Sequence, residues 1–184
     1  MFFEHLWVRL QVMRLFFSLV PDEALRPVLG ERAIDLARAI GGRPVPAHNI
    51  HLTLAFLGEV DRARRPGLHA ILDAMPRDAF TLALDRVGEW PRAGVAWIAP
   101  SIVPPPLTAL HAALTVALRG AGFPVEARPF QPHLTLVRRP SRTLADAPAD
   151  PLTWRVGRLS LMRSEAVGGA VRYREDAGVA LAVE

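Results

Sequence analysis

The chain has 184 residues, of which 51% are hydrophobic and 22% charged, and its formal net charge is +4. This length suits one domain with a substantial core, and the high apolar content excludes a disordered protein. The absence of cysteine and lysine excludes disulfide scaffolds, zinc–cysteine sites, thiol or Schiff-base catalysis and the P-loop. All 22 basic residues are therefore Arg, which binds phosphate bidentately, so we expect an anionic partner.

The N-terminal residues are expected to form an extension that is not part of the fold. We assign residues 1–12 to this extension, because a second start at Met13 opens the first apolar strand, and residues 13–184 to a single bilobal domain. The uncharged run from Leu15 is short for a signal peptide, and no A-x-A cleavage site follows. The longest stretch without Asp, Glu or Arg, 93–118, is interrupted by prolines, so it cannot be one spanning helix. We therefore expect a cytoplasmic protein with no membrane segment.

The hydrophobic pattern predicts alternating strands and helices. A buried strand over 15–20 precedes a helix that Pro21 and Asp22 open and Gly41 ends. The later patterns predict strands at 51–57, 80–87, 95–99, 133–137, 154–162 and 170–173, helices at 61–75 and 107–118, and a loop at 143–151. This order indicates an α+β fold of antiparallel sheets with helices on their outer faces.

One tetrapeptide occurs twice in the sequence. His51-Leu52-Thr53-Leu54 and His133-Leu134-Thr135-Leu136 are identical, and a proline-containing segment precedes each. Residues i and i+2 of a strand face the same way, so each copy presents an imidazole and a hydroxyl on one face and two leucines to the core. The alternative is that these His and Thr residues carry no function and occupy ordinary strand positions. The matching contexts favour two copies of a functional motif around one cleft.

This arrangement of side chains suits phosphodiester chemistry. One neutral imidazole can accept a proton from the attacking group, while one imidazolium protonates the leaving oxygen. The hydroxyls of Thr53 and Thr135 can donate hydrogen bonds to the non-bridging phosphate oxygens. No group of His, Asp and Glu has the spacing of metal ligands, so we expect neither a metal nor a cofactor.

The chain resembles the 2H phosphoesterase superfamily, and within it the bacterial RNA 2′,3′-cyclic phosphodiesterases, whose older name is 2′-5′ RNA ligase. The resemblance covers roughly 13–173 and rests on MRLFFSLVPDE, VPAHNIHLTLAFLGEV, VAWIAP with the later LHAAL, and PFQPHLTLVR. It implies two pseudo-symmetric lobes, each an antiparallel sheet with outer helices, around a central cleft. It also implies opening of a 2′,3′-cyclic phosphate at an RNA end to a 2′-phosphate, with His51 protonating the leaving 3′ oxygen and His133 activating water.

The sixth position of the motif differs between the two copies. It is Phe56 in the first and Arg138 in the second, and the resemblance implies that an Arg here touches the phosphate or the nucleobase. Strand parity points Arg138 away from His133, so the strand must end or twist there. The alternative is a solvated charge at the end of the strand.

Several functional alternatives stay open at this point. The same site could act on another cyclic phosphate, such as a nucleotide or an ADP-ribose derivative, or could run in reverse as a 2′-5′ RNA ligase. A non-catalytic RNA-binding protein could use Arg155, Arg158, Arg163, Arg172 and Arg174 as a basic groove, although these could equally pair with acids. The duplicated histidine favours an enzyme, for which we expect RNA with a cyclic phosphate end as partner and a monomeric state.

Overall fold

The computed structural model describes residues 12–182. Its strands and helices in chain order are β1 (Val12–Leu19), α2 (Leu25–Ile40), β2 (Arg43–Pro44), the 3-10 turn η1 (Ala47–Asn49), β3 (Leu52–Asp61), the 3-10 turn η2 (Arg62–Arg64), α3 (Arg65–Asp73), β4 (Phe80–Trp90), β5 (Val95–Ala99), α4 (Pro105–Gly120), β6 (Leu134–Arg138), β7 (Ala147–Val156), β8 (Arg158–Val167) and β9 (Ala170–Ala180). The expected extension lies outside the described residues except for Val12, which begins β1.

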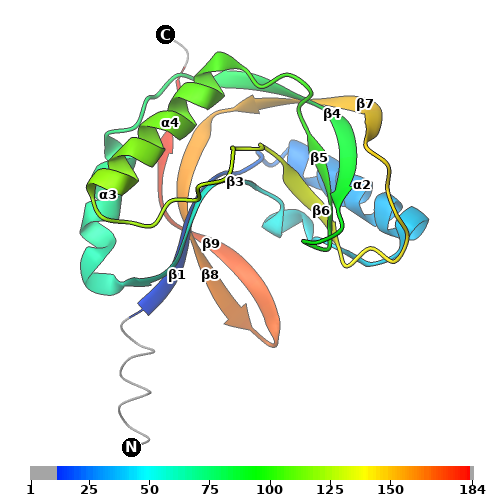
Figure 1. Ribbon diagram of the computed structural model, residues 1–184, viewed down its shortest axis with the longest axis horizontal. Coiled ribbons are helices and arrows are strands. Elements are labelled where there is room, and N and C mark those ends of the chain that lie inside the picture. Colours follow the sequence, from blue (N-terminus) through cyan, green and yellow to red (C-terminus); the bar gives the residue numbers. More distant parts are fainter. Residues whose placement is uncertain (1–11, 183–184) are drawn as a thin grey trace, which may run out of the picture.

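The strands form one sheet, and every pairing between two of the strands listed above is antiparallel (Figure 1). Within residues 12–182 it has nine strands in the order β7-β4-β5-β6-β3-β1-β8-β9, with β2 beside β6. The order is symmetric about its centre, where β6 and β3 meet through the single pair Leu52–Leu134. The α+β class is confirmed, and the two expected sheets are two halves joined at this pair.

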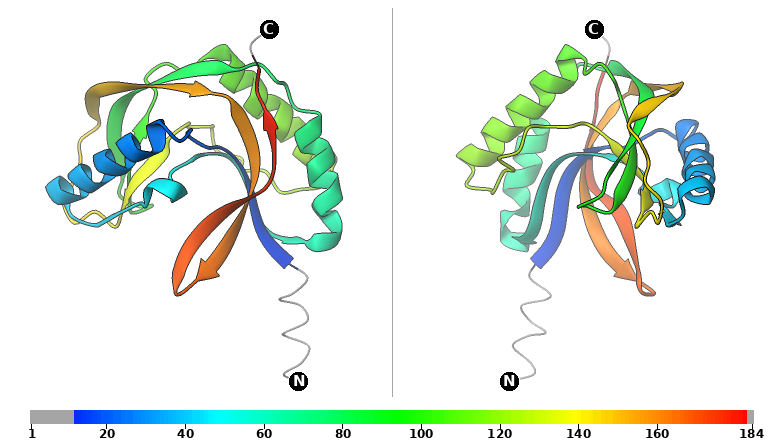
Figure 2. Two further views of the ribbon diagram at one scale, coloured as in Figure 1. Left: turned by 180° about the vertical axis from the view of Figure 1, so that it is seen from behind. Right: turned by 45° about the vertical axis from the view of Figure 1, so that its right-hand side comes forward.

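The helices cross between the two halves. α2 follows β1 in the chain but packs against β6 and β2, whereas α4 follows β5 and packs against β3. α3 contacts β8, β9 and α4, so α2 lies on one flank of the molecule and α3 with α4 on the other (Figures 1 and 2). No helix in the described part of the chain is long and apolar enough to cross a membrane.

The apolar positions of the repeats form the centre of the core. Leu52, Leu134 and Leu136 are fully buried and Leu54 is nearly so, as the strand periodicity predicts. The start of α2 also follows the sequence signal, because the carboxylate of Asp22 accepts hydrogen bonds from the backbone N–H groups of Ala24 and Leu25 at 3.0 and 2.8 Å. Such capping satisfies donors that a helix cannot satisfy itself.

Four expected boundaries are wrong. The strand expected over 154–162 is the end of β7 and the start of β8, which are separated at Gly157. Gly58 does not stop β3, because it adopts φ 71° within a strand that continues to Asp61. The expected loop 143–151 is strand from Ala147 onward, because β7 pairs there with β4 at the edge of the sheet despite its prolines. β9 continues to Ala180, since its pairing with β8 stabilises a polar sequence that has no periodic signal of its own.

Candidate active site

The two repeats meet where β3 and β6 adjoin, so their polar side chains enter one cavity. This cavity has a volume of about 70 Å³. Its lining consists of Val45, Asn49, His51, Thr53, His133, Thr135 and Arg138. The structure therefore brings together all five side chains that the sequence singles out. The lining contains no Asp or Glu, and no cluster of three potential metal ligands occurs within residues 12–182.

A β-bulge in each repeat explains why Arg138 faces the cavity. In β6, Thr135 pairs with Trp97 and Val137 with Ala96, so Leu136 is an extra residue. A bulge reverses the parity of the residues that follow it. Leu136 and Val137 are accordingly both fully buried, and Arg138 returns to the side of Thr135. Uninterrupted alternation would point Arg138 the other way, so the parity argument fails at this bulge.

The first repeat has the same irregularity. Ser18 pairs with Thr53 and Phe17 with Ala55, which leaves Leu54 as the extra residue of β3. Phe56 thereby occupies the position that corresponds to Arg138. Its ring is 55% exposed and lines a larger neighbouring cavity. The sixth position of the motif thus places a cation on one side of the site and an aromatic ring on the other.

Both histidines are held by the same backbone contact. Nδ1 of His51 donates to the carbonyl oxygen of Asn49 at 2.7 Å, and Nδ1 of His133 donates to that of Gln131 at 2.8 Å. A carbonyl only accepts hydrogen bonds, so each neutral ring carries its proton on Nδ1 and its lone pair on Nε2. Each Nε2 can then accept a proton or, once protonated, donate one.

Aromatic rings also fix both imidazoles. The His51 ring lies 4.9 Å from the rings of Phe16 and Tyr173, the latter edge-on. The His133 ring lies 4.4 Å from Trp90, again edge-on. Phe16 is 3% exposed and so belongs to the core. Trp90 is only half-buried and lines the larger cavity.

The environment disfavours a charge on either histidine in the free protein. Burial is the main cause that lowers the pKa of His51, to about 4, with Arg138 and His133 lowering it further and the Asn49 carbonyl opposing the shift. Burial also lowers the pKa of His133, whereas the Gln131 carbonyl and the carboxylate of Glu126 raise it. The two rings are chemically alike but have different charged neighbours: Arg138 acts on His51, whereas Glu126, which is itself paired with Arg128, acts on His133.

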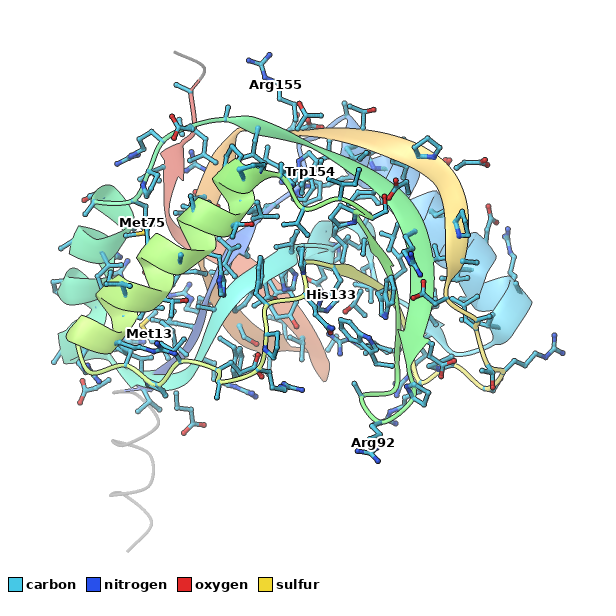
Figure 3. All side chains as sticks on the ribbon, turned by 45° about the horizontal axis from the view of Figure 1, so that its top comes forward. Met13, Met75, Arg92, His133, Trp154 and Arg155 are labelled. Atoms are coloured by element: carbon cyan, nitrogen blue, oxygen red, sulfur yellow. The ribbon has the colours of Figure 1, made fainter. Side chains whose placement is uncertain are left out.

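The larger cavity opens beside the first and shares part of its lining. Its volume is about 690 Å³, and Thr53, His133, Thr135 and Arg138 border both cavities. Its other polar and aromatic lining residues are Phe56, Trp90, Arg92, His111, Glu126, Arg128, Phe130 and Gln131. Figure 3 shows His133 near the centre of the molecule and Arg92 at its lower edge, pointing outward.

Sequence reasoning missed part of this second cavity. The ring of Phe130 stacks on His111 with the centroids 3.9 Å apart. The role of His111 in the lining was not predicted, because its partner comes from a loop. The expected basic groove is largely neutralised, since Arg158 pairs with Glu175, and Arg163 and Arg174 pair with Glu165.

The sequence matches a known protein family and is similar to named relatives. Residues 20–168 match the model of the 2′-5′ RNA ligase superfamily. The RNA 2′,3′-cyclic phosphodiesterase of Escherichia coli (strain K12) is 35% identical over 162 residues, which are 87% of this chain and 92% of the relative. The protein of the same name from Thermus thermophilus is 33% identical over 167 residues, 83% of this chain and 82% of the relative.

Solved structures agree with these relatives. The crystal structure of E. coli LigT in its apo form superposes with a TM-score of 0.83 at 31% identity, over 92% of this chain and 98% of that chain. The structure of LigT complexed with 3′-AMP gives 0.82 at 32% identity, over 93% and 99%.

Proposed function

The chain belongs to the 2′-5′ RNA ligase superfamily, and from this premise we propose that it hydrolyses the 2′,3′-cyclic phosphate at an RNA end to a 2′-phosphate. The observation that carries the proposal is that His51 and His133, each with Nδ1 bound to a carbonyl, line one 70 Å³ cavity together with Thr53 and Thr135. The names of the E. coli and T. thermophilus relatives support the same reaction.

The reaction needs one proton acceptor and one proton donor. Nε2 of His133 takes a proton from water, whose oxygen attacks phosphorus. The bond from phosphorus to the 3′ oxygen then breaks, and Nε2 of His51 gives its proton to that oxygen. The product carries a 2′-phosphate and a free 3′ hydroxyl. Thr53, Thr135 and Arg138 would stabilise the charge on the non-bridging oxygens.

Substrate binding must change the protonation of the site. With both pKa values below their ordinary range, both rings of the free protein are neutral at neutral pH. A bound phosphate anion favours the cationic form of a nearby imidazole and neutralises the opposing charge of Arg138. Glu126 favours a proton on His133, the reverse of the roles that the family resemblance implies, so the assignment of acid and base needs its own test.

That test uses a phosphodiester with a p-nitrophenolate leaving group, which departs without protonation. The variant that lacks the general acid should recover most of its rate on this substrate, and the variant that lacks the base should not. Recovery in His51→Ala would support the roles given above, whereas recovery in His133→Ala would reverse them.

The larger cavity suits the terminal nucleoside. A volume of about 690 Å³ lies within the roughly 300–1,000 Å³ typical of small-ligand pockets. Phe56, Trp90 and the stacked pair of His111 and Phe130 offer faces on which a base can stack. We include in the proposal that the protein acts as a monomer without a metal or cofactor, because one chain supplies every group that the reaction uses. A cytoplasmic location is a further part of the proposal.

The deciding experiment gives purified protein an oligoribonucleotide with a 2′,3′-cyclic phosphate end, with and without EDTA. We expect a 2′-phosphate product at the same rate in both, and losses of about 10²–10⁴-fold in His51→Ala and in His133→Ala. The variant His48→Ala, which removes an exposed imidazole three residues before His51, is the matched control. A near-normal rate in either active-site variant, or a strict requirement for a divalent ion, would refute the mechanism.

The same assay separates the remaining candidates. Faster turnover of cyclic nucleotides or cyclic ADP-ribose derivatives would replace RNA as the substrate, and formation of 2′-5′ junctions would reveal the reverse reaction. Binding of RNA without any turnover would refute the enzymatic reading altogether.

A further inference from the structure

The only asparagine and the only tyrosine of the sequence meet at His51. Asn49 is 8% exposed. Its side-chain Nδ2 donates to the carbonyl oxygen of Val171 at 2.8 Å, and its Oδ1 accepts from the backbone N–H of Tyr173 at 3.1 Å. β9 is the last strand of the sheet, so the Asn49 amide occupies the edge where another strand would pair.

This amide closes a ring of contacts around one imidazole. The backbone carbonyl of Asn49 holds Nδ1 of His51 at 2.7 Å, while its side chain holds the backbone that carries Tyr173. The Tyr173 ring in turn packs edge-on against His51, 4.9 Å away, and against Phe16, 5.0 Å away. Asn49 thus constrains the His51 ring in two ways. Its backbone carbonyl holds the ring in its plane, and its side chain holds the strand whose Tyr173 packs against the ring.

The second repeat has no counterpart of this clamp. Gln131 offers the equivalent carbonyl to His133, but its side chain is exposed and makes no hydrogen bond among those of residues 12–182. The two motifs therefore differ in their support: His51 is tied to the β8–β9 hairpin, whereas the ring of His133 packs edge-on against Trp90 of β4.

We propose that Asn49 is a positioning residue, which holds the β9 edge so that Tyr173 and the Asn49 carbonyl together fix the ring of His51 for proton transfer. Asn49 borders the smaller cavity, but its amide nitrogen and oxygen are both engaged by β9 and are not directed to a phosphate. The inference rests on the proposed function for its kinetic part only.

The kinetic test compares turnover with binding. In Asn49→Ala we expect kcat to fall about 10–100-fold, the range seen when groups that orient a metal-bound imidazole are removed, while KM changes by less than about twofold. Tyr173→Ala should reproduce this loss, and Tyr173→Phe, which keeps the ring, should restore most of it. A rise in KM with kcat unchanged would instead make Asn49 a substrate contact and overturn the proposal.

A matched control distinguishes positioning from loss of stability. Glu175→Gln weakens the ion pair between Arg158 and Glu175 within the same hairpin, and it should lower thermal stability while leaving kcat within about twofold. If Glu175→Gln and Asn49→Ala lose kcat in proportion to stability, the effect is general and the positioning role is refuted.

A spectroscopic readout works without any turnover. Biosynthetic 3-fluorotyrosine places a single ¹⁹F label in the protein, at Tyr173. In the wild type we expect its resonance to shift when inorganic phosphate binds, because the adjacent His51 ring then gains charge. In Asn49→Ala the resonance should move toward that of free 3-fluorotyrosine and lose its response to phosphate.

The two proposals fail in different ways. An inactive wild type whose ¹⁹F resonance still depends on Asn49 would refute the proposed reaction but keep the clamp. An active wild type in which Asn49→Ala changes neither kcat nor the ¹⁹F resonance would refute the clamp alone.

Discussion

The largely buried imidazole of His51 makes the stability of the protein depend on pH. Its pKa falls from an ordinary value of 6.5 to about 4 in the folded state, chiefly through burial. The unfolded chain therefore binds this proton first as the pH drops. The stabilisation is present above about pH 6.5 and is lost progressively as the pH falls toward about 4. At about 1.36 kcal/mol per pKa unit, the complete effect is about 3 kcal/mol.

Most of this loss should be measurable in a mild range of pH. Between about pH 7.5 and about pH 5, the two pKa values give a loss of about 2 kcal/mol from His51 alone. We therefore expect the free energy of unfolding in urea to fall by about 2 kcal/mol more in the wild type than in His51→Gln, which lacks the titrating group. His48→Gln controls for the removal of a histidine as such.

The difference in stability between the wild type and His51→Gln isolates the contribution of His51. Other titrating groups are common to the wild type and to His51→Gln, so they cancel in the difference. If both proteins lose the same stability between the two pH values, the His51 ring is solvated and the environment described for it is wrong.

Three further predictions concern the site. Arg138→Ala should raise KM by about tenfold or more through loss of a charge-assisted hydrogen bond, and NMR titration should show the pKa of His51 closer to its ordinary value, since Arg138 lowers it. Gly88→Ala should lower stability by about 1–3 kcal/mol in urea unfolding, because a Cβ at this position collides with the ring of Trp97; unchanged stability would show that the ring moves freely. The rate on cyclic-phosphate RNA should rise and then fall with pH. The two apparent pKa values of this profile belong to the coupled pair of His51 and His133 and not to either residue alone. A single monotonic rise with pH would indicate attack by hydroxide instead.

The periodicity of the repeats is sufficient to predict that the histidines and threonines of the two copies line one cavity. Alternation within a strand placed His51 and Thr53 on one face and the leucines in the core, and the duplicated string indicated that the two strands meet. These inferences depend only on local geometry, which a strand imposes on any sequence.

What the sequence did not reveal depends on contacts between distant segments. The bulge at Leu136 arises from the register with β5, and no local pattern marks it. The partners of His51 are Phe16 from β1 and Tyr173 from β9, which lie far apart in the chain. The boundaries at Ala147 and Ala180 likewise depend on pairing with neighbouring strands rather than on propensity.

The crossing of the helices has a consequence for how the molecule comes apart. Because α2 covers the half of the sheet to which its own preceding strand does not belong, and α4 does the converse, no contiguous half of the chain contains a complete layered unit. If one half of the sheet unfolds, the helix that follows its strand leaves the other half, and the apolar face of that other half becomes exposed to solvent. The cavity between them, built from β3 and β6 at their single shared pair, is therefore lost in the same cooperative step as the whole domain, and a cut between β4 and β5 should yield two fragments that regain structure only when mixed.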